Sequence, residues 1–245
     1  MRVVRWDGRR VATEDSVAVS RPFSGDDLRI GYAQALAAVT LGVVTMRGNS
    51  VVAGPLELLR FGPPKITPQR VDWPIEGGLL AAAAGGHWRI RSEGGRVTAG
   101  VEGYRPRLPR WLYTPSHLQV HLLFTRLFLL RLRGREPEPG VPASRPDRLR
   151  AATVDVAFCV TLAGLFGRRR RVGTVLAFIA GYHVACWSVS GRTLGGLVMR
   201  QRVVAVDGSR VSAAQALLRF ALLPVSWIAR QPVHDDIACT EVISE

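Results

Sequence analysis

The sequence predicts an α+β module followed by an all-α transmembrane domain of two or three spans. In the first part, short apolar runs alternate with glycine and proline. A Pro/Gly-rich stretch follows at 134–146, and the last hundred residues hold long stretches with almost no charge. The chain has 245 residues, 47% of them hydrophobic, which suffices for two compact units. We therefore expect a soluble module at 1–133, a linker at 134–146 and a membrane domain at 147–245.

In the first module, Asp26–Met46 begins with acidic residues and continues through alanine and leucine. This pattern predicts a helix that gives way to a strand near Leu41. The pairs Gly85-Gly86 and Gly94-Gly95 stand where antiparallel strands would turn, because glycine tolerates positive φ. Runs bounded by glycine and proline predict strands at Ser50–Ala53, Leu56–Phe61, Val71–Ile75, His87–Arg91 and Arg96–Tyr104.

Ser116–Arg133 predicts a long apolar helix whose last turn carries arginines, which suit the helix dipole. A curved antiparallel sheet followed by such a helix has the element order of a helix-grip arrangement, which can enclose an apolar ligand. This is an analogy from element order alone. His117 and His121 share one helix face at a spacing that suits metal ligands, but no third ligand residue accompanies them. We expect no metal and no cofactor.

Three apolar stretches follow the linker. Ala151–Gly167 contains one charged residue, Val172–Ser190 contains none, and Ala213–Ala229 contains one arginine. A membrane-spanning helix needs about 20 mostly apolar residues, so the first two are candidate spans. Four consecutive arginines, Arg168–Arg171, separate them. The alternative is two buried helices of a soluble domain.

Charged residues inside these stretches are candidates for a functional site. Asp155 lies in the first stretch, where an unpaired carboxylate costs several kcal/mol and has to pair, accept hydrogen bonds or carry a proton. Arg148 lies two helical turns earlier, about 10.5 Å along the axis, which is too far for direct contact. Arg219, in the third stretch, is the better partner because a buried guanidinium needs a carboxylate. We expect an Asp155–Arg219 pair; the alternative is that both reach the lipid headgroups.

Three blocks follow one another in the last hundred residues. Arg148–Asp155 places an arginine seven residues before an aspartate. Gly191–Arg219 opens with Gly-x-Thr-x-Gly and closes with Leu-Leu-Arg, and His234–Val242 is a His-Asp block followed by a threonine and a valine. Together they resemble the RDD family of small membrane domains, named for an arginine and two aspartates. The chain departs from the family pattern at Gly196, where a lysine is frequent, and at Cys239, where a glycine is usual.

The resemblance implies an integral membrane protein with a suspected link to solute or ion transport. It also marks a set of candidate buried ionic or pathway residues and a set of turn residues. The first set is Arg148, Asp155, Arg219 and Asp235, and the second is Gly191, Thr193 and Gly195.

The net charge of +14 favours a polyanionic neighbour, either nucleic acid or an anionic membrane face. Nucleic acid is excluded as a partner because the charge flanks apolar segments and no aromatic platform is interleaved with it. We expect a lipid bilayer with anionic headgroups as the partner, and a multi-pass location in the plasma membrane with the N-terminal module in the cytoplasm. We also expect a homo-oligomer, because two or three helices are too few for a translocation pathway. Small residues recur every fourth position from Gly173 to Ala185, as close helix packing requires.

Motifs of catalysis are missing from the sequence. It contains no GxSxG, no P-loop and no GxGxxG between a strand and a helix, and its three cysteines lie far apart. No apolar signal stretch follows the polar N-terminus. We predict a transport-associated or membrane-anchoring role without catalysis. The alternative is a membrane-anchored binding protein whose N-terminal module holds a lipid or another apolar ligand.

Overall fold

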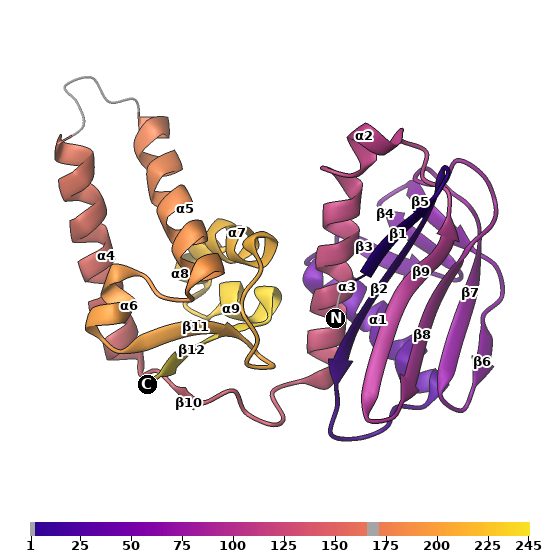
Figure 1. Cartoon of the computed structure of the whole chain (residues 1–245), viewed down its shortest axis with the longest axis horizontal. Coiled ribbons are helices and arrows are strands. Elements are labelled where there is room, and N and C mark those ends of the chain that lie inside the picture. Colours follow the sequence, from indigo (N-terminus) through magenta and orange to yellow (C-terminus); the bar gives the residue numbers. More distant parts are fainter. Residues whose placement is uncertain (1–2, 166–171) are drawn as a thin grey trace. The chain divides into compact units, whose positions relative to one another are not determined.

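The computed structural model describes residues 3–165 and 172–245 (Figure 1). The chain divides into two compact units, Met1–Gly134 and Arg135–Glu245. The arginine cluster expected to form a loop at 168–171 lies outside the described residues.

The N-terminal unit is a large antiparallel sheet with three helices. The strands, in chain order, are β1 (Val3–Asp7), β2 (Arg10–Ala18), β3 (Val44–Arg47), β4 (Ser50–Ala53), β5 (Leu56–Phe61), β6 (Lys65–Thr67), β7 (Arg70–Gly77), β8 (His87–Glu93) and β9 (Arg96–Tyr104). The helices are α1 (Gly25–Val39), α2 (Arg110–Tyr113) and α3 (His117–Arg133). The sheet order is β1-β2-β9-β8-β7-β5-β4-β3, with β6 paired to β7. Strand β2, near the start of the chain, therefore pairs with β9, the last strand of this unit.

This unit is the sheet-rich α+β module that the sequence predicts. Strands β4, β5 and β9 have the expected bounds, and the β8–β9 hairpin turns at Gly94 and Gly95, both with positive φ. The expected helix-to-strand segment is two elements, because Leu41 and Gly42 adopt positive φ (52° and 80°) between α1 and β3. The β1–β2 hairpin was not expected, since its outward residues are polar and its N-terminal segment reads as a charged tail.

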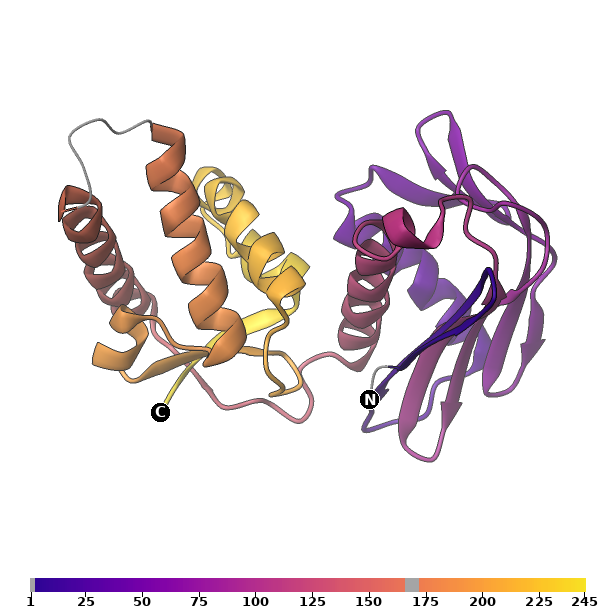
Figure 2. The same cartoon turned by 45° about the horizontal axis from the view of Figure 1, so that its top comes forward.

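Helices α1 and α3 cover the concave face of the sheet (Figures 1 and 2). The inward side chains of the central strands are almost wholly buried, among them Val71, Trp73, Trp88 and Ile90. Tyr32 of α1 lies at the centre of this core. Its ring contacts two tryptophans of the sheet and two phenylalanines of α3, namely Trp73, Trp88, Phe124 and Phe128. Aromatic packing therefore joins both helices to the sheet.

The C-terminal unit combines helices with a small sheet. Its helices are α4 (Arg145–Leu165), α5 (Val172–Val189), α6 (Leu194–Val198), α7 (Ala213–Ala221), α8 (Leu223–Ala229) and α9 (Val233–Ala238). Its strands, β10 (Val141–Pro142), β11 (Gln201–Ala205) and β12 (Thr240–Ser244), form an antiparallel sheet in the order β10-β12-β11. Helices α4 and α5 run side by side away from this sheet (Figures 1 and 2).

The expectation that the C-terminal domain is all-helical is wrong, because the unit contains the small sheet β10-β12-β11. The C-terminal unit is largely helical, but β11 and β12 form an antiparallel pair with Val203 opposite Val242, and most residues of both strands are buried. Part of the predicted linker belongs to it, because Val141 and Pro142 pair with β12. The third apolar stretch is two short helices, α7 and α8, and Pro224 in the first turn of α8 lacks the N–H that a continuous helix needs.

The membrane spans expected from the sequence are not found as such in the described residues. Over 3–165 and 172–245, no helix is both long enough and apolar enough to cross a bilayer.

Candidate functional site

Two arginines converge on one carboxylate in the C-terminal unit. Asp235 forms ion pairs with Arg219 through Oδ1 and with Arg148 through Oδ2. The Oγ1 atom of Thr240 donates a hydrogen bond of 2.9 Å to Asp235 and accepts one of 2.7 Å from Arg219. The side chains of Asp235 and Arg219 are 8% and 4% exposed. This is a buried charge cluster in which two positive charges share one carboxylate.

Each member of the cluster comes from a different element. Arg148 lies on α4, Arg219 on α7, Asp235 on α9, and Thr240 begins β12. The close approach of α7 and α9 is fixed by Gln215, whose side chain donates a hydrogen bond of 3.1 Å to the carbonyl of Ala238. The fold therefore brings together residues up to 92 positions apart in the sequence. No local sequence pattern predicts that they meet.

Two aromatic side chains line the cluster. The Arg219 guanidinium lies over the ring of Trp187, 4.9 Å from its centroid, a cation–π contact that suits a desolvated arginine. His234 accepts or donates a 2.7 Å hydrogen bond with Ser226 through Nδ1, while its Nε2 lies 3.4 Å from Asp235. Burial, together with the charges of Arg219 and Arg148, lowers the pKa of His234 to about 3. This histidine is therefore neutral at physiological pH.

Asp155 is the centre of a second cluster. Its Oδ1 accepts a 2.9 Å hydrogen bond from the hydroxyl of Tyr182 and a 2.8 Å bond from the backbone N–H of Gly195. The Tyr182 oxygen in turn accepts a bond from the backbone N–H of Leu194. Asp155 is buried, so these donors partly replace the water that a carboxylate loses on burial.

The Gly-x-Thr-x-Gly turn builds this second cluster. Gly191 has a φ of 75°, which favours glycine. Thr193 is the N-cap of α6, and its side chain accepts a hydrogen bond from the N–H of Gly196. A Cβ on Gly195 would stand 2.0 Å from the carbonyl oxygen of Ala151 on α4, so only glycine permits this approach. The turn thus delivers the Gly195 N–H to Asp155.

The expected pair between Asp155 and Arg219 is wrong. Arg219 pairs with Asp235 because α9 folds back against α7, and Asp155 is satisfied by a hydroxyl and a backbone N–H. Arg148 contacts Asp235 and not Asp155, in keeping with the axial distance between them. The two clusters still share one space, since Asp155, Arg148 and Arg219 all line a cavity of about 180 Å³.

Residues 171–239 of the chain match the model of the RDD family. This segment is similar to that family. The matched segment, called here the RDD region, contains Arg219, Asp235 and the Gly-x-Thr-x-Gly turn, whereas Arg148 and Asp155 precede it. The family suggests a membrane protein of uncertain role, which supports a membrane location for this chain. No curated protein and no solved structure matches the chain.

The backbone at Cys239 shows why glycine is usual at this position of the family pattern. Cys239, where the family usually has glycine, ends α9 with a φ of 51°. Glycine adopts this left-handed conformation without steric cost, and a residue with a Cβ pays roughly 1–2 kcal/mol for it. Sequence reasoning did not find Tyr182, Gln201 or His234 as neighbours of the ionic residues of the C-terminal unit. The His-Asp block alone carried a signal, since His234 directly precedes Asp235.

The two histidines of α3 are half-buried in the N-terminal unit. His121 Nε2 is 3.0 Å from Thr13 Oγ1, and its ring meets Trp88 edge-on. His117 packs against Tyr113. Within 3–165 and 172–245, no group of three or more His, Cys, Asp or Glu side chains is placed to hold a metal ion.

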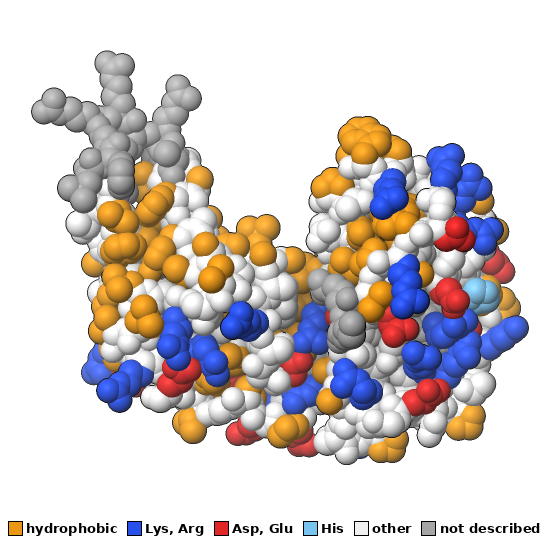
Figure 3. Space-filling model, in the orientation of Figure 1, with side chains coloured by type: hydrophobic (Ala, Val, Ile, Leu, Met, Phe, Trp, Pro, Cys, Tyr) orange, Lys and Arg blue, Asp and Glu red, His pale blue; other side chains and the backbone are white. Residues whose placement is uncertain are grey.

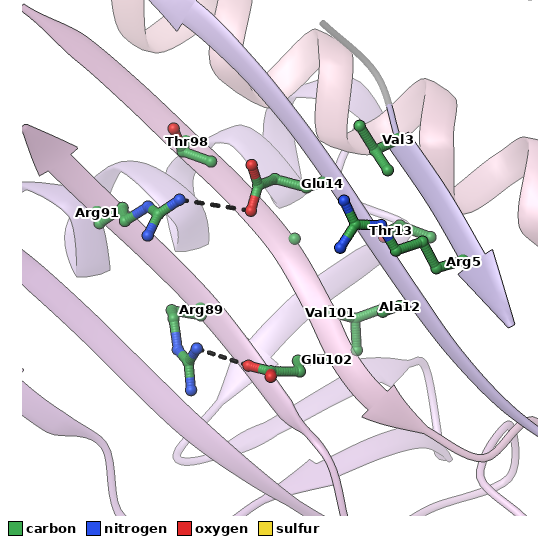
Figure 4. Close-up of a pocket in the computed structure, with 11 residues that line it drawn as sticks. Val3, Arg5, Ala12, Thr13, Glu14, Arg89, Arg91, Thr98, Val101 and Glu102 are labelled. Carbon is green, nitrogen blue, oxygen red and sulfur yellow. Dashed lines mark hydrogen bonds and ion pairs between the residues drawn. The ribbon is translucent and has the colours of Figure 1, made fainter. Parts of the chain in front are cut away.

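The outer face of the N-terminal sheet carries a charged groove of about 270 Å³ (Figure 4). Arg89 pairs with Glu102 at 2.6 Å, and Arg91 lies 3.5 Å from Glu14 across β9. Gly100 forms the floor, where β2 and β9 approach so closely that a Cβ would stand 1.9 Å from the carbonyl oxygen of Thr13. Both glutamates of the groove are thus paired with arginines, and Arg5 lines it as a third arginine. These charges are exposed, so their pairs contribute little to stability.

Proposed function

We propose that the C-terminal unit works in a lipid bilayer in a transport-associated role, without catalysing a reaction. The observation that carries this proposal is the cluster of Arg148, Arg219 and Asp235, buried inside a small helical unit whose outer surface is apolar. Ionisable residues inside membrane proteins are expensive and commonly mark solute or ion pathways. The RDD match supports the same interpretation.

The outer surface of this unit exposes many large apolar side chains (Figure 3). Trp227 and Ile228 of α8 are 84% and 86% exposed. Further exposed side chains lie on α4, α5 and α6, namely Leu149, Val156, Val160, Leu176, Phe178, Leu197 and Val198. Soluble proteins rarely expose apolar surface on this scale, and such surfaces mark membrane or protein contacts. A bilayer would cover this surface.

Arginines lie where α4 begins and α5 has ended. Arg145 and Arg150 are exposed on the first turns of α4, and Arg192 follows α5. Each basic residue beside a bilayer attracts anionic headgroups by about 1 kcal/mol, and basic flanks favour the cytoplasmic side. The proposal therefore places the N-terminal unit, which precedes α4, in the cytoplasm.

A second copy of the chain is part of the proposal. Gly173, Ala177, Gly181 and Ala185 lie one turn apart on an exposed side of α5. A Cβ on Gly173 or Gly181 would meet nothing within 4 Å, so the side is open. Small residues at this spacing allow helices to approach closely in lipid. Association of copies would supply the helices that a pathway needs.

Carbonate extraction of membranes from cells that produce the full chain tests the location. We expect the protein in the membrane pellet, and recovery in the soluble wash would overturn the proposal. Proteoliposomes then test the role. Asp155→Asn should abolish solute or ion flux with insertion unchanged, while Asp147→Asn, an exposed carboxylate on the same helix, should keep it. Unchanged flux in Asp155→Asn would leave Asp155 a structural residue and favour a membrane-anchoring role.

A second candidate function belongs to the N-terminal unit, as a binder of an apolar molecule. An apolar cavity of about 80 Å³ lies between α1, α3 and the concave face of the sheet, lined by Tyr32, Phe61, Trp88, Tyr104, Tyr113 and Phe124. The sheet order and the long closing helix α3 favour a helix-grip arrangement. Drug-sized sites measure roughly 300–1,000 Å³, so the ligand would be small or only partly enclosed.

Mass spectrometry of solvent extracts from the purified full chain tests this second function. We expect one apolar compound to copurify in a stoichiometric amount. A protein that carries no such compound and takes up no fluorescent apolar probe would contradict it.

A further inference from the structure

The cavity of about 180 Å³ in the C-terminal unit carries unsatisfied hydrogen-bond donors. Gln201, on β11, and Arg219, on α7, both line it, and each residue is 3% exposed. Gln201 Nε2 and Arg219 Nε have no hydrogen-bond partner among the described residues. An unmade hydrogen bond on a buried polar group costs about 1–3 kcal/mol. Two such donors beside one cavity point to an acceptor that occupies it.

The same cavity carries an acceptor of opposite charge. Asp155 lines it, and the two hydrogen bonds that Asp155 accepts both reach Oδ1. Among the described residues, no cation forms an ion pair with this carboxylate; its partners are the neutral Tyr182 hydroxyl and the Gly195 N–H. A buried carboxylate without a cation favours a ligand that supplies one.

The charges of the cavity wall balance but are separated. Arg148 and Arg219 share Asp235, which leaves one positive charge at that cluster. His234 adds none at neutral pH, and His183, also in the wall, hydrogen-bonds the carbonyl of Ile179. Asp155 contributes one negative charge elsewhere in the wall. A bound anion or a bound cation would each leave a net charge buried, whereas a dipolar ligand would leave none.

We propose that this cavity binds a small zwitterion, with its carboxylate on Arg219 and Gln201 and its ammonium group on Asp155. The cavity of about 180 Å³ is several times the roughly 10–15 Å³ that one water needs, and well below a drug-sized site. The ligand class is therefore an amino acid with a small side chain. That the zwitterion is a transported solute rests on the proposed function; that it binds does not.

Thermal unfolding of the purified full chain in detergent tests the binding at constant ionic strength. The probes are glycine and alanine as zwitterions, acetate as an anion and methylammonium as a cation. A ligand that binds the folded state raises the Tm in a saturable manner. We expect this for glycine or alanine only. Equal stabilisation by acetate or methylammonium would overturn the proposal. If no probe raises the Tm in a saturable manner, the proposal is also overturned, and water fills the cavity.

Two variants separate binding from folding. Asp155→Asn removes the negative charge and should reverse the preference, so that acetate binds at least tenfold more tightly than glycine. Gln201→Met should weaken glycine binding about tenfold, and Asp147→Asn, which does not line the cavity, should leave it unchanged. An Asp155→Asn protein that folds but keeps its preference for glycine would contradict the assignment. Binding without flux in proteoliposomes would refute transport and leave the site standing.

Discussion

Arg219 and Asp235 form an ion pair in which both side chains are buried, 4% and 8% exposed. The pair joins α7 to α9, and Arg148 extends it to α4. Three helices of the C-terminal unit are thus held by one carboxylate. A charge that has left water is costly without its partner, so removing the carboxylate should destabilise the unit.

Removing the shared carboxylate should destabilise the unit strongly. Asp235→Leu leaves Arg219 and Arg148 without their carboxylate, and we expect a loss of about 3–5 kcal/mol. Arg219→Met keeps Asp235 paired with Arg148 and loses the hydrogen bond to Thr240, so it should cost less, about 1–3 kcal/mol. The double variant should lose less than Asp235→Leu, because only the partly exposed Arg148 then lacks its carboxylate. Unfolding of the detergent-purified chain measures this. Arg150→Ala, which removes an exposed pair with Asp147, should change stability by less than about 1 kcal/mol. Single variants as stable as this control would refute the argument.

Gly195→Ala should separate α6 from α4. The added Cβ would stand 2.0 Å from the carbonyl oxygen of Ala151, so the helix has to move and the hydrogen bond to Asp155 is lost. We expect a loss of at least 2 kcal/mol, on the scale of overpacking plus a lost bond to a buried charged group. Gly77→Ala, in the N-terminal unit, is the control, because its Cβ would meet only the end of the flexible Arg60 side chain, at 3.3 Å. Equal Tm values for the two variants would be inconsistent with the close approach.

Stability should fall as the pH drops below about 6.5. Burial lowers the pKa of His234 to about 3 from its ordinary value of 6.5. Between these values the unfolded chain takes up a proton that the folded chain refuses, so the stabilisation is fully present above pH 6.5 and lost progressively below it. The slope from this group is at most about 1.4 kcal/mol per pH unit. In His234→Gln the slope between pH 6 and pH 4 should decrease. His117→Gln, in the other unit, serves as control, and an identical slope in both variants would contradict the prediction.

Ser24→Ala should weaken the start of α1 in the N-terminal unit. The Ser24 hydroxyl accepts a 3.1 Å hydrogen bond from the backbone N–H of Asp27, and losing an N-cap of this kind costs about 1 kcal/mol. Hydrogen exchange of the first α1 amides should be several-fold faster. Ser116 precedes α3 in the same way but makes no capping bond, so Ser116→Ala should not change exchange at the start of α3. Unchanged exchange in Ser24→Ala would show that the cap contributes nothing.

Local pattern predicted much of the N-terminal fold. Strands bounded by glycine, such as Leu56–Phe61 and Arg96–Tyr104, have the expected limits because turn chemistry and apolar alternation act over a few residues. The β1–β2 hairpin escaped prediction because its side chains are mixed. Its stability comes from pairing with β9, 78–93 residues later in the chain.

The candidate site shows the same division between local and distant information. The Gly-x-Thr-x-Gly turn was marked by the resemblance to the RDD family, and each of its residues has a local reason: positive φ at Gly191, a cap at Thr193 and close packing at Gly195. Asp155 and Arg219 were recognised because a charge inside an apolar stretch needs a partner, and Arg148 and Asp235 were marked by the resemblance. Their pairing was not predictable from these patterns.

By itself, the sequence determined that Asp155 and Arg219 need partners, because each is a charge inside an apolar stretch; Arg148 and Asp235 were marked by the resemblance to the RDD family. Only the tertiary structure decided who those partners are. Arg219 meets Asp235 because α9 packs against α7, and Asp155 meets a tyrosine hydroxyl and a backbone N–H because Gly195 lets α6 touch α4. The need for a partner is a property of one residue in its local environment, whereas the partner is set by packing between elements far apart in the chain.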